Sequence, residues 1–234
     1  MSRNRGSLTT ILLFFFTVTF FSLPANADYY SEPTELVTRA ASVYKGFMSD
    51  PNMEWFQRNV GRARGIFIVP QMLRGGFIIG GSGGRGLLVA LDELSAKWSS
   101  PAFYSMGSVS FGLQIGADSS EIILLIMTER GLNALLSTDY KLGADVSVAA
   151  GPVGASAKAQ TADILAFGRA QGIFGGVSIE GAAITPLYDW NRQYYGKPVQ
   201  IFDILINQTL NNPQADSLRQ LLPKAQPNAQ PIGR

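Results

Sequence analysis

Five arginines without an intervening acid are the most distinctive charged feature of this 234-residue chain. They are Arg58, Arg62, Arg64, Arg74 and Arg85, and they follow the aromatic pair Trp55 and Phe56. Guanidinium groups bind phosphate and carboxylate oxygens through paired hydrogen bonds, and aromatic rings suit the lipid–water interface. We therefore expect these seven residues to form a lipid-binding surface that faces anions. A solvated surface without a ligand is the alternative.

The chain has no histidine and no cysteine, which excludes several kinds of site. Disulfides, thiolate zinc sites, cysteine nucleophiles and histidine bases are all impossible. Carboxylates could still act in catalysis, and the acids considered are Asp92, Glu93, Asp118, Asp145, Asp163, Glu180 and Asp189. They stand singly or side by side, and no spacing pairs two of them on one face. A hydrolase whose catalytic groups are carboxylates alone remains an alternative function. We predict a protein that is not an enzyme and that holds no metal or cofactor.

A glycine-rich segment contains two patterns that resemble catalytic or nucleotide-binding motifs. Residues 81–86 fit G-x-G-x-x-G, but a dinucleotide site needs a following helix and an acid about 20 residues on. Residues 87–89 predict a strand instead, and no acid lies between Glu93 and Asp118. The overlapping G-x-S-x-G at 80–84 would need a histidine base. The segment therefore predicts a glycine hairpin or bulge in which two backbones approach closely.

Hydrophobic periodicity divides the chain into helical ends and a β-rich middle. Apolar residues recur at helical spacing over Thr34–Met48, and Asp189–Leu210 is predicted to be helical again. Alternation with period two predicts strands over Val109–Ile115 and Leu142–Val148. Ile122–Met127 is continuously apolar, which predicts a strand covered on both faces. The run from 173 to 179 predicts a further strand that its glycines bend.

The N-terminal 27 residues have the features of a secretory signal peptide. Arg3 and Arg5 precede an uncharged run from Leu8 to Leu23, and Ala25-Asn26-Ala27 provides a cleavage site. We therefore predict an exported protein that is periplasmic, peripherally membrane-associated or secreted. An uncleaved anchor is the alternative, although the apolar run is shorter than the ~20 residues that span a bilayer. Removing both arginines leaves 17 basic and 17 acidic residues, and no nucleic-acid partner is expected.

Eight short segments resemble the SYLF domain and occur in the same order as in that family. They are Arg64-Gly65-Ile66 running into Val69-Pro70, residues 80–83, 98–104, 114–116, 142–145, 150–152, 171–178 and 194–196. The resemblance covers about Glu35 to Leu210. It implies a lipid-binding module, because eukaryotic relatives bind phosphoinositides and membranes and attach to actin-patch machinery, while bacterial relatives are exported. Many bacterial relatives carry a lipidated cysteine after the signal. Asp28 stands there in this chain, which favours reversible membrane contact.

The residues and the resemblance together predict an α+β fold. In it, a curved antiparallel, glycine-rich β-sheet resembling a half-barrel is packed by N-terminal and C-terminal helices. We expect a signal peptide at 1–27, one SYLF-like domain at 28–222 and a flexible tail at 223–234. The expected function is lipid binding at the bacterial envelope, with anionic phospholipid or a membrane surface as partner. The alternative is a structural or protein-interaction scaffold of the periplasm or outer membrane, with glycine-rich strand edges as pairing sites for an envelope protein.

The first prediction concerns processing. The exported protein should begin at Asp28, because Ala25-Asn26-Ala27 is the small-x-small site that closes the apolar run. N-terminal sequencing of exported material measures this directly. Exported protein that retains Met1 would contradict it.

Overall fold

The computed structural model describes residues 32–76, 79–111, 116–137, 140–143, 146–151, 161–170, 173–175 and 181–224. The predicted signal peptide and most of the predicted tail lie outside these residues, so both stay predictions. Within the described part, the Trp98 Nε1–H donates a 2.8 Å hydrogen bond to the carbonyl oxygen of Pro223. The domain therefore makes contact at least as far as the first residue of the predicted tail.

Helices lie mainly at the two ends of the described chain, as the sequence predicts. They are α1 (Glu32–Ser49), η1 (Pro51–Met53), α2 (Glu54–Asn59), η2 (Val60–Arg62), α3 (Glu129–Leu136), α5 (Tyr188–Tyr195), α6 (Ile201–Leu205), η3 (Pro213–Ala215) and α7 (Asp216–Arg219). The strands between them are β1 (Gly65–Gly76), β2 (Ile79–Asp92), β3 (Lys97–Trp98), β4 (Ala102–Phe111), β5 (Gly116–Ile126), β6 (Tyr140–Lys141), β7 (Val148–Ala150), β8 (Ile164–Ala170), β9 (Ile173–Gly175) and β10 (Ala183–Pro186).

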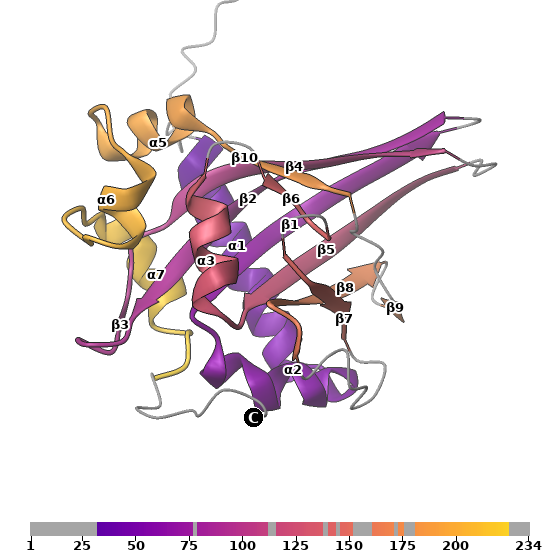
Figure 1. Cartoon of the computed structure of the whole chain (residues 1–234), viewed down its shortest axis with the longest axis horizontal. Coiled ribbons are helices and arrows are strands. Elements are labelled where there is room, and N and C mark those ends of the chain that lie inside the picture. The colour runs from indigo at the N-terminus through magenta and orange to yellow at the C-terminus, as the bar shows by residue number, and fades with distance from the viewer. Residues whose placement is uncertain are drawn as a thin grey trace, which may run out of the picture.

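The strands form one curled sheet in the order β6-β10-β4-β2-β1-β5-β8-β7, with β3 beside β2 and β9 beside β8. Neighbouring strands are antiparallel apart from β7 and β8, which are parallel. Figure 1 shows the long strands crossing between α3 in front and α1 behind. The predicted α+β fold with a half-barrel-like sheet and flanking helices is confirmed.

The sheet separates two hydrophobic cores. Side chains of α1, α2 and α7 pack on one face, and those of α3 and α6 pack on the other. Strand β5 contributes to both, because Ile122, Leu124 and Ile126 face the α3 side whereas Ile123 and Leu125 face α1. All five are fully buried. The continuous apolar run therefore forms a strand covered on both faces, as predicted.

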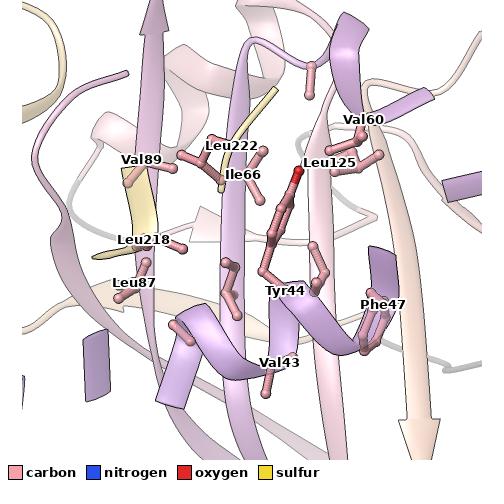
Figure 2. Close-up of a cluster of buried hydrophobic side chains, with 14 of the residues drawn as sticks. Val43, Tyr44, Phe47, Val60, Ile66, Leu87, Val89, Leu125, Leu218 and Leu222 are labelled. Atoms are coloured by element: carbon pink, nitrogen blue, oxygen red, sulfur yellow. The ribbon is translucent and has the colours of Figure 1, made fainter. Parts of the chain in front are cut away.

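Helix α1 covers its face of the sheet with one apolar stripe. Val37, Ala40, Tyr44 and Phe47 recur at three- and four-residue steps and are buried. Figure 2 shows Tyr44 rising from α1 between Ile66 and Leu125, with Leu218 and Leu222 of the C-terminal segment beside them. Burial raises the pKa of Tyr44, so its hydroxyl stays protonated. The helix predicted over Thr34–Met48 is confirmed.

Two strand or helix predictions need correction. The strand predicted over Val109–Ile115 is not among the corrections: residues 109–111 lie in β4, and residues 112–115 lie outside the described residues, so that part stays a prediction. The alternation at Leu142–Val148 is divided by a turn at Gly143, whose φ of 86° is left-handed. Leu142, Val146 and Val148 are still all buried in one core. The predicted helix from Asp189 to Leu210 divides at Gly196 into α5 and α6.

The parallel β7–β8 pair is held by a network around Asp163. Its carboxylate accepts hydrogen bonds from the Thr128 hydroxyl at 2.7 Å and from the Ser147 backbone N–H and hydroxyl at 3.0 and 2.8 Å. Arg130 lies 3.2 Å away. Burial alone would raise the pKa of Asp163, but these hydrogen bonds and the Arg130 charge outweigh it and hold the pKa below its usual range. Thr128 also caps α3 by accepting from Gly131 N–H.

The second prediction concerns this network. The substitution Asp163→Asn should lower the free energy of unfolding by about 2 kcal/mol at neutral pH, because Ser147 donors then face an amide. The ionised carboxylate stabilises the fold fully above the unfolded pKa of ~3.9, and that stabilisation is lost as pH falls through the lowered folded pKa. Urea titrations at several pH values should therefore show the two proteins converging in acid. Asp189→Asn, at an exposed pair with Arg192, is the control. A difference that stays constant below pH ~3.9 would contradict the assignment.

Candidate functional site

Three of the predicted arginines lie within the short segment that leads from α2 into β1. Arg58 lies in the last turn of α2, Arg62 ends η2, and Arg64 stands just before β1. Phe56 and Val60 anchor the segment in the core, and Asn59 is buried as well. Arg58 is exposed, and Arg62 and Arg64 are half-buried. The segment thus holds three guanidinium groups within seven residues at the surface, and we call this the α2 basic surface.

Two of these arginines have glutamate partners. Arg58 lies 3.4 Å from Glu54 one turn earlier, with side chains 65% and 70% exposed. Arg64 lies 2.6 Å from Glu93, with side chains 37% and 56% exposed. Exposed ion pairs of this kind contribute about 0–1 kcal/mol. A phosphate group can therefore replace either carboxylate at small cost.

The prediction that Phe56 belongs to the lipid-binding surface is wrong. Its side chain is fully buried, and its ring packs edge-on against Tyr44, Phe47 and Phe167 at centroid distances of 6.0, 5.6 and 5.2 Å. Adjacent helix positions point about 100° apart, so Trp55 and Phe56 cannot share an outward face. Trp55 is half-buried and lies 5.6 Å from the Phe167 ring. It keeps an exposed edge beside the α2 basic surface.

Arg74 and Arg85 do not join the other three arginines, nor each other. Arg74 is the register partner of Ser82, so these two residues project from the same face of the sheet. Ser82 and Arg85 are three positions apart in β2, which places them on opposite faces. Arg85 lies on the α1 side, where its guanidinium carbon is 4.7 Å from the Trp190 ring centroid. The structure therefore contains no single surface of five arginines within its described residues.

Sequence reasoning missed a groove beside α1. Two adjoining hollows of about 590 and 670 Å³ share Arg39 and Gln71. The first is lined by Glu32, Glu35, Leu36, Leu73, Gly83, Gly84, Arg85, Ser105, Met106 and Trp190, and the second by Ser42, Val43, Pro70, Ser119, Ser120, Glu121 and Arg169. We call the two together the α1 groove. Arg39 lies on the polar side of α1, and no pattern in the sequence distinguishes it from an ordinary solvated arginine.

An ion-pair network closes one end of the α1 groove. Arg169 of β8 lies 2.6 Å from Glu121 of β5 and 3.7 Å from Asp50 at the end of α1. Its guanidinium also lies over the Phe47 ring at 5.2 Å. A Cβ at Gly46 would meet this guanidinium at 2.7 Å, so a larger residue there would require the Arg169 side chain to shift. The network fixes α1 against the sheet.

The described residues hold neither a metal cluster nor a spanning helix. No three acidic side chains in that part of the chain gather closely enough to bind a metal ion. None of its helices is long and apolar enough to cross a membrane. The polar groups that the structure brings together are arginines, glutamates, serines and an amide. This set is suited to binding ions and polar head groups through charge and hydrogen bonds.

Comparison with known proteins gives the family. The Ysc84 family, described as "Las17-binding protein actin regulator", matches residues 107–225. This chain belongs to the Ysc84 family. The match confirms the predicted SYLF membership. It begins within β4 and runs through the C-terminal helices, so it leaves out α1 and the β1–β2 hairpin.

Relatives of this Ysc84-family chain include longer eukaryotic proteins. SH3 domain-containing YSC84-like protein 1 of Homo sapiens is 28% identical over 169 residues, which are 70% of this chain and 49% of the human protein. Protein YSC84 of Saccharomyces cerevisiae is 31% identical over 169 residues, 69% of this chain and 36% of the yeast protein. The chain thus spans about half the length or less of these curated relatives. The name of the human protein records an SH3 domain, and the matched family is described as an actin regulator.

The third prediction tests the correction at Phe56. In this Ysc84-family domain, Phe56→Ala should lower the free energy of unfolding by about 3–5 kcal/mol, because it removes a buried ring from an aromatic cluster. Arg58→Gln, two positions away and exposed, should change it by less than ~1 kcal/mol. Chemical denaturation measures both values. Equal effects of the two substitutions would contradict the placement of Phe56 in the core.

Proposed function

We propose that this domain is a non-enzymatic lipid-binding module that contacts anionic phospholipid through the α2 basic surface. The observation that carries the proposal is the display of Arg58, Arg62 and Arg64 on one short segment that Phe56 and Val60 anchor rigidly in the core. The resemblance of its sequence segments to the SYLF domain supports it, because that resemblance implies membrane binding. The half-exposed edge of Trp55 adds an aromatic group suited to the interface.

The strength of the contact follows from the number of basic residues in the α2 basic surface. Each basic residue near an anionic membrane contributes about 1 kcal/mol, so three arginines give at most ~3 kcal/mol. Millimolar affinity corresponds to about 4 kcal/mol. Charge alone therefore gives weak, reversible contact, and apolar groups such as Trp55 must add the rest. Reversible contact agrees with the presence of Asp28 at the position where many bacterial relatives carry a lipidated cysteine.

We further propose that the protein acts in the bacterial envelope after export. The features of the 1–27 segment support this proposal. A periplasmic domain with a weak basic surface would sample anionic leaflets without staying attached. Partners on this proposal are phospholipid surfaces and, secondarily, an envelope protein.

A protein-interaction scaffold is the second candidate function. The description of the matched family as a Las17-binding regulator favours it, since that name records a protein partner. On this alternative the domain would bind an envelope protein, and vesicle composition would not affect its distribution. The two functions therefore differ in a single vesicle measurement.

The fourth prediction is the vesicle experiment. The full exported chain should co-sediment with vesicles of phosphatidylglycerol and phosphatidylcholine, and less with phosphatidylcholine alone. The triple variant Arg58→Gln, Arg62→Gln, Arg64→Gln should bind at least about tenfold more weakly, because it removes up to ~3 kcal/mol of attraction, which corresponds to roughly 150-fold. Higher salt should weaken the wild type in the same way, as the Debye length falls to about 8 Å at physiological ionic strength.

A matched control removes the same charge elsewhere. Arg192, Lys197 and Lys224 are exposed in the C-terminal part of the chain, and their joint replacement by glutamine should leave vesicle binding nearly unchanged. Equal losses in both triple variants would mean that only net charge matters. Binding that ignores salt and anionic lipid would reject the proposal and favour the scaffold.

A further inference from the structure

The α1 groove presents charges of both signs to one hollow. Glu32, Glu35 and Arg39 lie on one stripe of α1, and Arg85 faces them from β2 across the hollow of about 590 Å³. None of the four has an ion pair within the described residues, although Glu35 and Arg39 have the spacing for one. Arg85 lies over the Trp190 ring instead, which fixes the guanidinium without neutralising it. The hollow is therefore complementary to a ligand that carries both charges.

Apolar side chains continue from these charges along the groove. Leu36 and Leu73 line the charged hollow, and Val43 and Pro70 line the adjoining one. Leu73 is 55% exposed although it lies on the helix-facing side of the sheet. Each hollow falls within the ~300–1,000 Å³ typical of small-molecule sites. An apolar chain leaving the charged hollow would pass Arg39 and Gln71, and the groove would end at the Arg169–Glu121 pair.

A glycine without a packing role keeps the groove open. A Cβ at Gly83 would meet nothing within 4 Å, and its φ is not left-handed. Gly84 and Gly86 differ, because a Cβ there would meet backbone oxygens at 2.5 and 2.7 Å. Packing thus requires Gly84 and Gly86 but not Gly83. Any larger side chain at Gly83 would project into the hollow that Arg39 and Arg85 also line.

We propose that the α1 groove binds one molecule of a single-chain phospholipid whose head group carries phosphate and amine, a lysophosphatidylethanolamine. Arg39 and Arg85 hold the phosphate, Glu32 and Glu35 hold the ammonium, and the acyl chain lies along Leu73, Pro70 and Val43. This site extends the proposed lipid-binding function from a membrane surface to a single lipid. It uses none of the residues of the α2 basic surface, so either proposal can fail without the other.

The test is calorimetric titration of lysophosphatidylethanolamine, below its critical micelle concentration, into the full chain. Gly83→Leu should fit the fold, since the position is open, and should weaken binding about tenfold or more by filling the groove. Gly75→Leu is the matched control: Gly75 is equally open and lies on the same face of β1 as Leu73, but it does not line the groove. It should bind like the wild type, and unfolding midpoints confirm that both variants fold.

Head-group variants of the ligand and charge variants of the protein complete the test. Arg39→Gln, at an exposed helix position, should also weaken binding about tenfold, the loss of one charge-assisted contact. Lysophosphatidylglycerol, which lacks the amine, should bind more weakly to the wild type, and monoacylglycerol weaker still. The Gly83→Leu variant should still co-sediment with anionic vesicles. Equal binding of the two leucine variants, no binding by the wild type, or equal binding of monoacylglycerol would overturn the proposal.

Discussion

The strands of this protein are longer than the helical layers that cover them, and much of the structure follows from that mismatch. Strand β2 has 14 residues, which is about 46 Å at ~3.3 Å per residue. A helix packed across it covers a width of only ~10–12 Å. Figure 1 shows β1, β2, β4 and β5 running past the helices on one side. On the face that α1 covers, the side chains change from large and apolar to small along the strands. Ile68, Leu87 and Phe103 lie in the core under the helices, whereas Gly83 and Ser105 lie beyond it.

Glycines on β2 have two different roles along these long strands. Gly84 and Gly86 face the α3 side, where a bulge in β1 places Val69 and Gln71 directly against them. There glycine lets two strands and the Phe67 ring approach closely. Gly83 faces the α1 side and touches nothing, so its missing side chain leaves a hollow instead. One glycine-rich segment thus tightens the sheet on one face and opens it on the other.

Periodicity predicted the elements that are buried continuously and failed where one residue decides a direction. The stripe on α1 and the apolar run in β5 are long and regular, and both were found from the sequence. Phe56 was misassigned because its neighbour Trp55 has the same chemistry, and only the packing of α2 decides which of the two rings is buried. The break at Gly143 was missed because Leu142, Val146 and Val148 enter one core from both sides of a turn. Alternation alone cannot distinguish that arrangement from a strand.

The candidate site shows the same limit more sharply. The arginines could be recognised by type, but the faces of Arg74 and Arg85 depend on the register of the β1–β2 hairpin and on its bulge. A shift of one residue reverses every face, so no spacing rule assigns them. Arg39 was missed because its partners come from strands that lie far from it in sequence. One β2 residue that lines the same hollow is a glycine, Gly83, which carries no chemical signal.

Helix α1 connects the two proposed lipid contacts mechanically. Its residues from Glu32 to Val43 border the α1 groove, and its last residue leads through Asp50 directly into η1 and α2. Asp50 caps η1 by accepting the Asn52 N–H at 2.9 Å, and its carboxylate also lies 3.7 Å from Arg169 at the closed end of the groove. The Asn52 hydrogen bond holds the pKa of Asp50 below its ordinary value, so the carboxylate is ionised at neutral pH. Because α1 is also fixed by Tyr44 and Phe47 in the core, a membrane contact at α2 would position the groove at a constant distance from the bilayer. A weak surface contact would then raise the local concentration of single lipids beside the groove, and neither site would need high affinity alone.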